Sequence, residues 1–99
     1  MSQTQEVRGR ATVIRQDGPW TVITYHRTDV VRFKRAGDKV TVKLNSNGWR
    51  TPTTKLRMNQ AAHQFGLGYS VAQRHFDWYV TLRADGRELP FADGMTFTA

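Results

Sequence analysis

The sequence predicts an α+β fold with one central helix, at about residues 52–65, between two blocks of antiparallel strands. Before and after that segment, apolar and polar residues alternate, as they do in strands buried on one face. Within it, apolar residues recur every three or four positions, which is typical of a helix packed on a sheet. The 99 residues contain no linker or repeat, so we expect a single domain, 1–99, whose sheet can curl into a partly open barrel.

The first strands are predicted from short alternating segments. Residues 1–5 are polar and are expected to be disordered. Residues 7–15 form a candidate first strand, and residues 20–25 form a second, in which Trp20 and every second residue after it share one side. The turn signal Asp17-Gly18-Pro19 lies between the two strands, which indicates an antiparallel pair.

The next hairpin is predicted from residues 30–34 and 39–44, which flank the turn 35–38. We expect Lys34 to pair with Lys39, because this register keeps the apolar residues on one face. That face holds Val31, Phe33, Val40, Val42 and Leu44, and the other holds Arg32, Lys34, Lys39, Thr41 and Lys43. Val30 is the one apolar residue that the register does not bury. Two lysines set opposite each other repel, which suits a surface that receives an anion, although lysines also protect edge strands.

The helix has predicted signals at both ends. Thr51 can cap its first turn, Pro52 falls at the first helical position, and Gly66 can end it in a left-handed conformation. The apolar face is predicted to hold Met58, Ala61, Ala62 and Phe65, and the polar side Asn59, Gln60, His63 and Gln64. So narrow an apolar stripe requires a sheet beneath it.

Four more strands are predicted after the helix. Residues 69–74 and 77–83 are joined at His75-Phe76. A two-residue turn at Asp85-Gly86 is expected to pair Arg83 with Glu88, and the chain ends in a strand around Met95 and Phe97.

Composition excludes several classes of function. The chain has no Cys, so disulfides, thiolate nucleophiles and Cys-based zinc sites are excluded. No apolar run reaches the length of a membrane span, and residues 1–10 lack the apolar core of a signal peptide. The sequence therefore indicates an intracellular protein without a membrane partner.

The positive charge is concentrated in the middle of the chain. The net charge is +7, and residues 27–57 hold nine Lys or Arg residues against two Asp. Such a patch is typical of a protein with an anionic partner, most often nucleic acid, although a solvated face gives the same composition. We assign eight candidate nucleic-acid-binding residues: Arg32, Lys34, Lys39, Lys43, Trp49, Arg50, Lys55 and Arg57.

Trp49 lies between Lys43 and Arg50 in this stretch, where its ring could stack on a base. The favoured alternative is that Trp49 anchors the helix to the sheet, and Trp20 and Trp78 are expected in the core. The first turn of the helix can also receive an anion, although capping alone explains its threonines.

An enzyme is the less favoured interpretation. The three histidines lack the spacing of metal ligands, and no sequence motif indicates a cofactor or a catalytic residue. A metal-free nuclease built on His63 and Asp77 is the remaining enzymatic alternative.

Several motifs resemble a group of short proteins of tailed bacteriophages. They are Gly48-Trp49-Arg50-Thr51 through to Arg57-Met58-Asn59-Gln60, then Phe65-Gly66-Leu67-Gly68, Asp77-Trp78, and Phe91 with Asp93-Gly94-Met95. The resemblance runs from about Val30 to Met95. It implies a phage protein that acts in the cytoplasm of the bacterial host, and it implies no activity. It also leaves open a second partner class: an acidic host protein, bound by an inhibitor of a host enzyme or defence system.

Overall fold

The protein is an α+β domain with one helix and two antiparallel sheets in the part that the structure, a computed structural model, describes (residues 11–99). The elements are β1 (Thr12–Asp17), β2 (Trp20–Tyr25), β3 (Thr28–Ala36), β4 (Lys39–Leu44), α1 (Pro52–Phe65), β5 (Tyr69–Arg74), β6 (Asp77–Leu82), β7 (Glu88–Pro90) and β8 (Met95–Thr98). The expected disorder of residues 1–5 and the strand start at Val7 lie outside the described residues. The fold class predicted from the sequence is confirmed.

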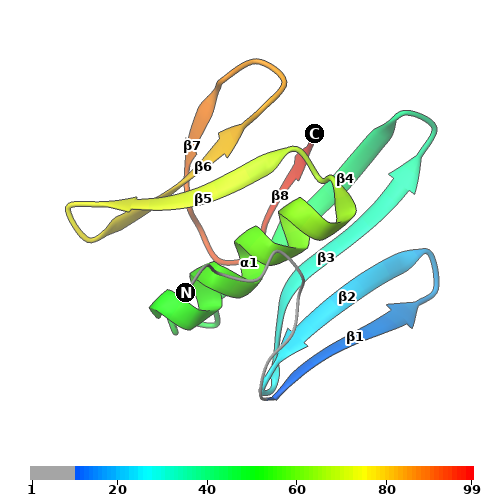
Figure 1. The fold of residues 1–99 in the computed structure, drawn as a ribbon, viewed down its shortest axis with the longest axis horizontal. Coiled ribbons are helices and arrows are strands. Elements are labelled where there is room, and N and C mark those ends of the chain that lie inside the picture. Colours follow the sequence, from blue (N-terminus) through cyan, green and yellow to red (C-terminus); the bar gives the residue numbers. More distant parts are fainter. Residues whose placement is uncertain (1–10) are drawn as a thin grey trace.

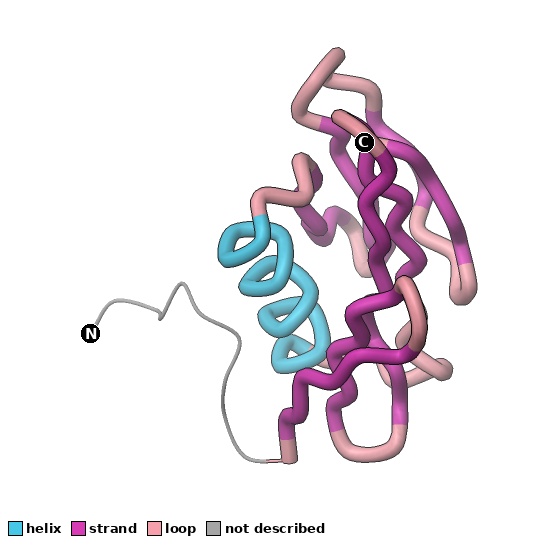
Figure 2. Tube along the Cα trace, turned by 90° about the vertical axis from the view of Figure 1, so that its right-hand side faces the viewer, coloured by secondary structure: helices cyan, strands magenta, loops and turns pink. Residues whose placement is uncertain are grey.

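The strands form two open sheets (Figure 1). One has the order β1-β2-β3-β4-β8, and the other has the order β5-β6-β7. Neither closes on itself, so the partly open barrel allowed by the sequence is not formed. A single hydrophobic core joins both sheets to α1. Seen from the side, the helix stands on one side of the strands (Figure 2). Within residues 11–99, no helix covers the opposite, outer face of the five-stranded sheet.

Both predicted ends of the helix are confirmed. The Thr54 N–H donates to the Thr51 hydroxyl oxygen at 3.2 Å, which satisfies one of the free amides of the first turn. Gly66 has φ +63°, and the Leu67 N–H donates to the Ala62 carbonyl at 2.9 Å. These local bonds stop the helix at the predicted residues.

The polar side of the helix is less exposed than predicted. Gln60 is buried, and Asn59 docks on the free edge of β5. The Asn59 side-chain amide donates to the Val71 carbonyl at 2.9 Å, and its oxygen accepts from the Val71 N–H at 2.7 Å. Asn59 is covered because the second sheet packs against α1, which a helix on a single sheet would leave exposed. Gln60 instead contacts Arg57, which packs against β1 and β2 of the first sheet.

The β3–β4 hairpin keeps its predicted faces in a different register. Lys34 lies across from Thr41, and Ala36 pairs with Lys39, so the pairing of Lys34 with Lys39 was wrong by two residues. The turn shortens because Gly37, at φ +63°, occupies the first central position of a two-residue loop, where type II′ turns need glycine. A shift of two residues leaves every side chain on its predicted face.

Val30, the apolar residue that the predicted register did not bury, is buried in a β-bulge. Ile23 pairs with Val31, but the next residue of β2, Thr24, pairs with Asp29. The extra residue on β3 lets Val30 and Val31 both enter the core.

The β6–β7 hairpin also differs from its prediction. Thr81, not Arg83, pairs with Glu88. The Arg83 N–H instead donates to the Gly68 carbonyl at 2.9 Å, and the Gly86 N–H closes a longer loop on Leu82. The side chain of Glu88 forms its ion pair with Arg74.

Candidate nucleic-acid interface

Lysines gather on the uncovered face of the five-stranded sheet. Phe33 and Val42 point into the core, so the residues that alternate with them point outward. The outward set contains Arg32, Lys34, Lys39, Thr41 and Lys43, and the register places Thr98 across from Thr41 and Thr96 across from Lys43. Lys39 and Lys43 are exposed and Lys34 is half-buried. Three of the eight predicted residues therefore share one open face with hydroxyl groups.

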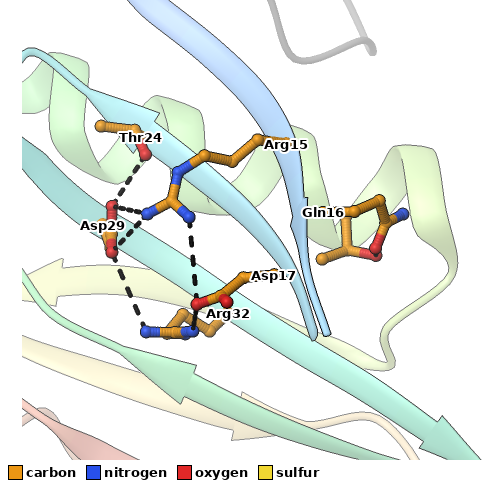
Figure 3. A network of polar contacts seen from close by, with 7 residues as sticks. Arg15, Gln16, Asp17, Thr24, Asp29 and Arg32 are labelled. Atoms are coloured by element: carbon orange, nitrogen blue, oxygen red, sulfur yellow. Dashed lines mark hydrogen bonds and ion pairs between the residues drawn. The ribbon is translucent and has the colours of Figure 1, made fainter. Parts of the chain in front are cut away.

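Arg32 lies on the same face but is neutralised by carboxylates (Figure 3). It forms ion pairs with Asp17 and Asp29, and Arg15 donates to Asp29 at 3.0 Å. Asp29 also accepts from the Thr24 hydroxyl at 2.7 Å. The two carboxylates neutralise the charge of Arg32, although its buried Nε has no hydrogen-bond partner among the described residues. Arg32 is therefore a poor candidate for a phosphate contact.

The three lysines differ from Arg32 in this respect. Lys34, Lys39 and Lys43 form no ion pair with a carboxylate among residues 11–99. The Lys34 ammonium lies 4.8 Å from the centre of the Trp20 ring, which attracts a cation without neutralising it. Their charge is therefore available to an external anion.

Arg57 does not belong to this surface. Only 9% of it is exposed, and its Nε donates to the Thr12 hydroxyl at 3.0 Å. Its Nη1 donates to the Gln60 side-chain oxygen at 3.1 Å, and its guanidinium lies 5.7 Å from the centre of the Tyr25 ring. Arg57 stabilises the junction between α1 and β1–β2, because these contacts hold it beneath the surface.

The other three predicted residues lie at the start of α1. Trp49 is 68% exposed, so the favoured interpretation that it anchors the helix to the sheet is wrong. The Arg50 guanidinium lies 5.1 Å from the centre of the Phe91 ring, and Lys55 is half-buried on the first turns of the helix. The eight residues thus divide into an open lysine face, a group at the helix start, and two arginines held within the protein.

Asp93 fixes the loop that carries Trp49. One carboxylate oxygen accepts from the Ser46 N–H at 2.7 Å and from the Ser46 hydroxyl at 2.6 Å, and the other accepts from the Gly48 N–H at 3.1 Å. Partial burial raises the pKa of Asp93, but these bonds and the nearby Arg50 outweigh that effect and hold the pKa below its usual range. The Asp93 carboxylate therefore links the segment before β8 to the loop that precedes α1.

A pocket of about 760 Å³ opens between this loop and the turn that joins β2 to β3. The turn contributes Tyr25, His26 and Arg27, and the loop contributes Ser46 and Trp49. Residues 26–29 lie between two predicted strands and were not among the candidate binding residues. The aromatic and basic run Tyr25-His26-Arg27 was a signal for this site, but its approach to Trp49 depends on the tertiary fold.

The position of Trp20 on the outer face of the sheet was also not predicted from the sequence. Both Trp20 and Trp78 were expected in the core; Trp78 is there, but Trp20 is half-buried on the outer face beside Lys34. The alternation of β2 places Trp20 on the same face as Val22. Whether that face is the core or the outer face depends on the pairing of β2 with β3, which sets Val22 across from Arg32.

The residues of the enzymatic alternative are both on the surface. His63 is exposed on α1, and Asp77 is exposed at the start of β6. Among residues 11–99, no group of three or more His, Asp or Glu side chains is arranged to hold a metal ion. The helix in this part of the chain is too short and too polar to cross a membrane.

Comparison with known families identifies the group to which the chain belongs. The family model described as Kyanoviridae Gp96 protein matches residues 2–98. The chain belongs to this family. Kyanoviridae are tailed phages, so the resemblance to tailed-phage proteins is confirmed, and the Gp96 match extends it to residues 2–29, which the motifs left outside. No curated protein and no solved structure matches the chain.

Proposed function

We propose that this phage protein binds nucleic acid through the lysine face, defined as Lys34, Lys39 and Lys43. The supporting observation is that these three cations lie on an uncovered sheet face without an acidic partner among the described residues. Lysines on such a face attract phosphates by charge and release counterions when they bind.

The neighbouring hydroxyl groups support the same assignment. Thr41, Thr96 and Thr98 stand among the lysines, and threonine side chains commonly donate hydrogen bonds to phosphate oxygens. Lys39 and Lys43 are four residues apart on one strand, which separates them by about 13 Å at the rise of a β-strand. The lysine face is therefore long enough to contact more than one phosphate along a nucleic-acid backbone. We propose that this binding takes place in the cytoplasm of the bacterial host.

The test measures the affinity of the protein for single- and double-stranded DNA and RNA by fluorescence anisotropy. The variant Lys34→Gln/Lys39→Gln/Lys43→Gln is compared with Arg74→Gln/Arg83→Gln/Arg87→Gln, which loses the same charge from the three-stranded sheet and its β6–β7 loop. We expect the first variant to lose at least tenfold in affinity and the second to lose much less. Equal losses would mean that only net charge matters, and the proposal would be wrong.

A second function, inhibition of a host protein, is favoured by Phe76. This residue is 90% exposed at the tip of the β5–β6 hairpin and has φ +71°, a conformation unusual for a bulky side chain. Non-glycine residues held in left-handed backbone conformations cluster at binding and switch sites, which makes Phe76 a candidate contact residue. A stoichiometric partner recovered from nuclease-treated host lysate, and lost with Phe76→Ser but kept with the lysine-face variant, would favour this function.

A further inference from the structure

The pocket between the β2–β3 turn and the loop before α1 has the size and lining of a small-ligand site. Its volume, about 760 Å³, falls within the range of about 300–1,000 Å³ that small-molecule sites occupy. It lies at the end of the molecule where β2 meets β3, and none of the three residues of the lysine face lines it. It is therefore a second, separate candidate site.

Aromatic rings form part of the pocket wall. The rings of Tyr25 and His26 are adjacent, with centres 4.4 Å apart, and Trp49 contributes a ring that is largely exposed from the loop. A planar heteroaromatic ligand that stacks on such side chains gains affinity without specific hydrogen bonds.

The charge of the lining favours an anionic ligand. Arg27 lines the pocket, and no carboxylate is among the residues that line it in the described part of the chain. Arg27 forms no ion pair with any carboxylate of residues 11–99. Asn47, on the loop before α1, is an exposed residue whose side-chain amide can donate a hydrogen bond to a ligand in the pocket.

Contacts behind the pocket hold its walls in place. Asp93 fixes the Ser46 end of the loop, as described above. The Arg57 guanidinium lies against the Tyr25 ring, and the His26 N–H donates to the Ala11 carbonyl at 2.8 Å. Because these walls are braced before any ligand arrives, binding costs little ordering of the protein.

We propose that this pocket binds a nucleotide, with the base stacked on Trp49 and the Tyr25–His26 pair and the phosphate at Arg27. Two sources share this chemistry: a free mononucleotide and the terminal nucleotide of a single strand. The site does not depend on the lysine face, so either assignment can fail while the other holds.

The test follows two kinds of NMR signal during titration with the four ribonucleoside 5′-monophosphates. They are the indole N–H of Trp49 and the backbone amides of His26 and Thr28, which line the same pocket and remain observable in the Trp49 and Arg27 variants. Adenosine and inorganic phosphate are the controls for base alone and phosphate alone. We expect saturable shifts with mononucleotides and weaker binding of either control. Trp49→Ala and Arg27→Gln should each weaken binding by about fivefold or more, whereas Phe76→Ala, which removes a different exposed ring, should leave it unchanged.

One further probe, a short 5′-phosphorylated single strand, distinguishes a strand end from a free mononucleotide as the ligand. Shifts with a short 5′-phosphorylated single strand, but not with mononucleotides, assign the site to a strand end. Shifts with mononucleotides assign it to free nucleotides. Absence of shifts with both probes, or binding that survives Trp49→Ala and Arg27→Gln, overturns the inference. Nucleotide binding that persists in the Lys34→Gln/Lys39→Gln/Lys43→Gln variant shows that the pocket acts without the lysine face.

Discussion

The Lys34 ammonium lies over the Trp20 ring, 4.8 Å from its centre, on the uncovered face of the five-stranded sheet. The two residues come from adjacent strands, β2 and β3, and no carboxylate of the described chain pairs with Lys34. The ring thus holds the cation in one region while leaving its charge available. Arg32 also lies near the Trp20 ring, 5.6 Å from its centre, but its charge is neutralised by Asp17 and Asp29. The absence of a carboxylate partner among the described residues therefore distinguishes Lys34 from Arg32.

Replacing Trp20 should weaken nucleic-acid binding through Lys34. We expect Trp20→Leu to lower affinity by about twofold to fivefold, because a partly exposed cation–π contact contributes about 0.5–1 kcal/mol. A double-mutant cycle with Lys34→Gln measures this coupling by fluorescence anisotropy. If the two changes are additive, the ring does not act through the lysine.

Asn59 should contribute strongly to stability. Asn59→Ala leaves the Val71 N–H and carbonyl without their side-chain partner, at a cost of about 1–3 kcal/mol. Urea unfolding followed by circular dichroism measures the change. His63→Ala, an exposed change on the same helix, is the control and should stay within about 0.5 kcal/mol of the wild type. Equal effects of the two changes would contradict the edge-docking role of Asn59.

Arg57 should act on stability and not on binding. Arg57→Gln removes hydrogen bonds to Thr12 and Gln60 beneath the surface, so we expect a loss of about 1–3 kcal/mol in the free energy of unfolding. The affinity of the folded variant for nucleic acid should equal that of the wild type. If the folded variant instead bound nucleic acid more weakly and with less dependence on salt, Arg57 would be a phosphate contact.

Asp93 should make stability depend on pH in acid. Its pKa is lower in the folded protein than in the unfolded chain, so its carboxylate stabilises the fold above the unfolded value of about 3.9. That contribution is lost as the pH falls through the lower, folded pKa. Asp93→Asn should therefore be less stable than the wild type at neutral pH, and the difference should shrink below about pH 4 in unfolding experiments. A difference that is constant with pH would rule out the charge of Asp93 as its cause.

Local signals explain which parts of the fold were predictable. Thr51, Pro52 and Gly66 define the ends of α1 by capping and by backbone conformation, both of which act within a few residues. The faces of β3 and β4 were predictable because alternation is a property of each strand alone. Their register was not, since pairing Lys34 with Thr41 or with Lys39 leaves the same side chains outside.

The candidate site was predictable only in part, because burial and neutralisation arise between distant segments. Lys34, Lys39 and Lys43 share a face by alternation. Nothing near Arg57 in the sequence indicates that β1 and β2 would enclose its side of the helix. The pairing of Arg32 with Asp17 likewise requires strands β1 to β3 to be assembled.

The most direct test of the lysine face is the dependence of binding on salt. The slope of log K against log salt concentration is measured for the wild type and for Lys34→Gln/Lys39→Gln/Lys43→Gln on one oligonucleotide. If each lysine contacts a phosphate, the slope should become shallower by about 2–3, since each contact contributes about 0.7–0.9. An unchanged slope, or a wild-type affinity that does not respond to salt, would contradict the account.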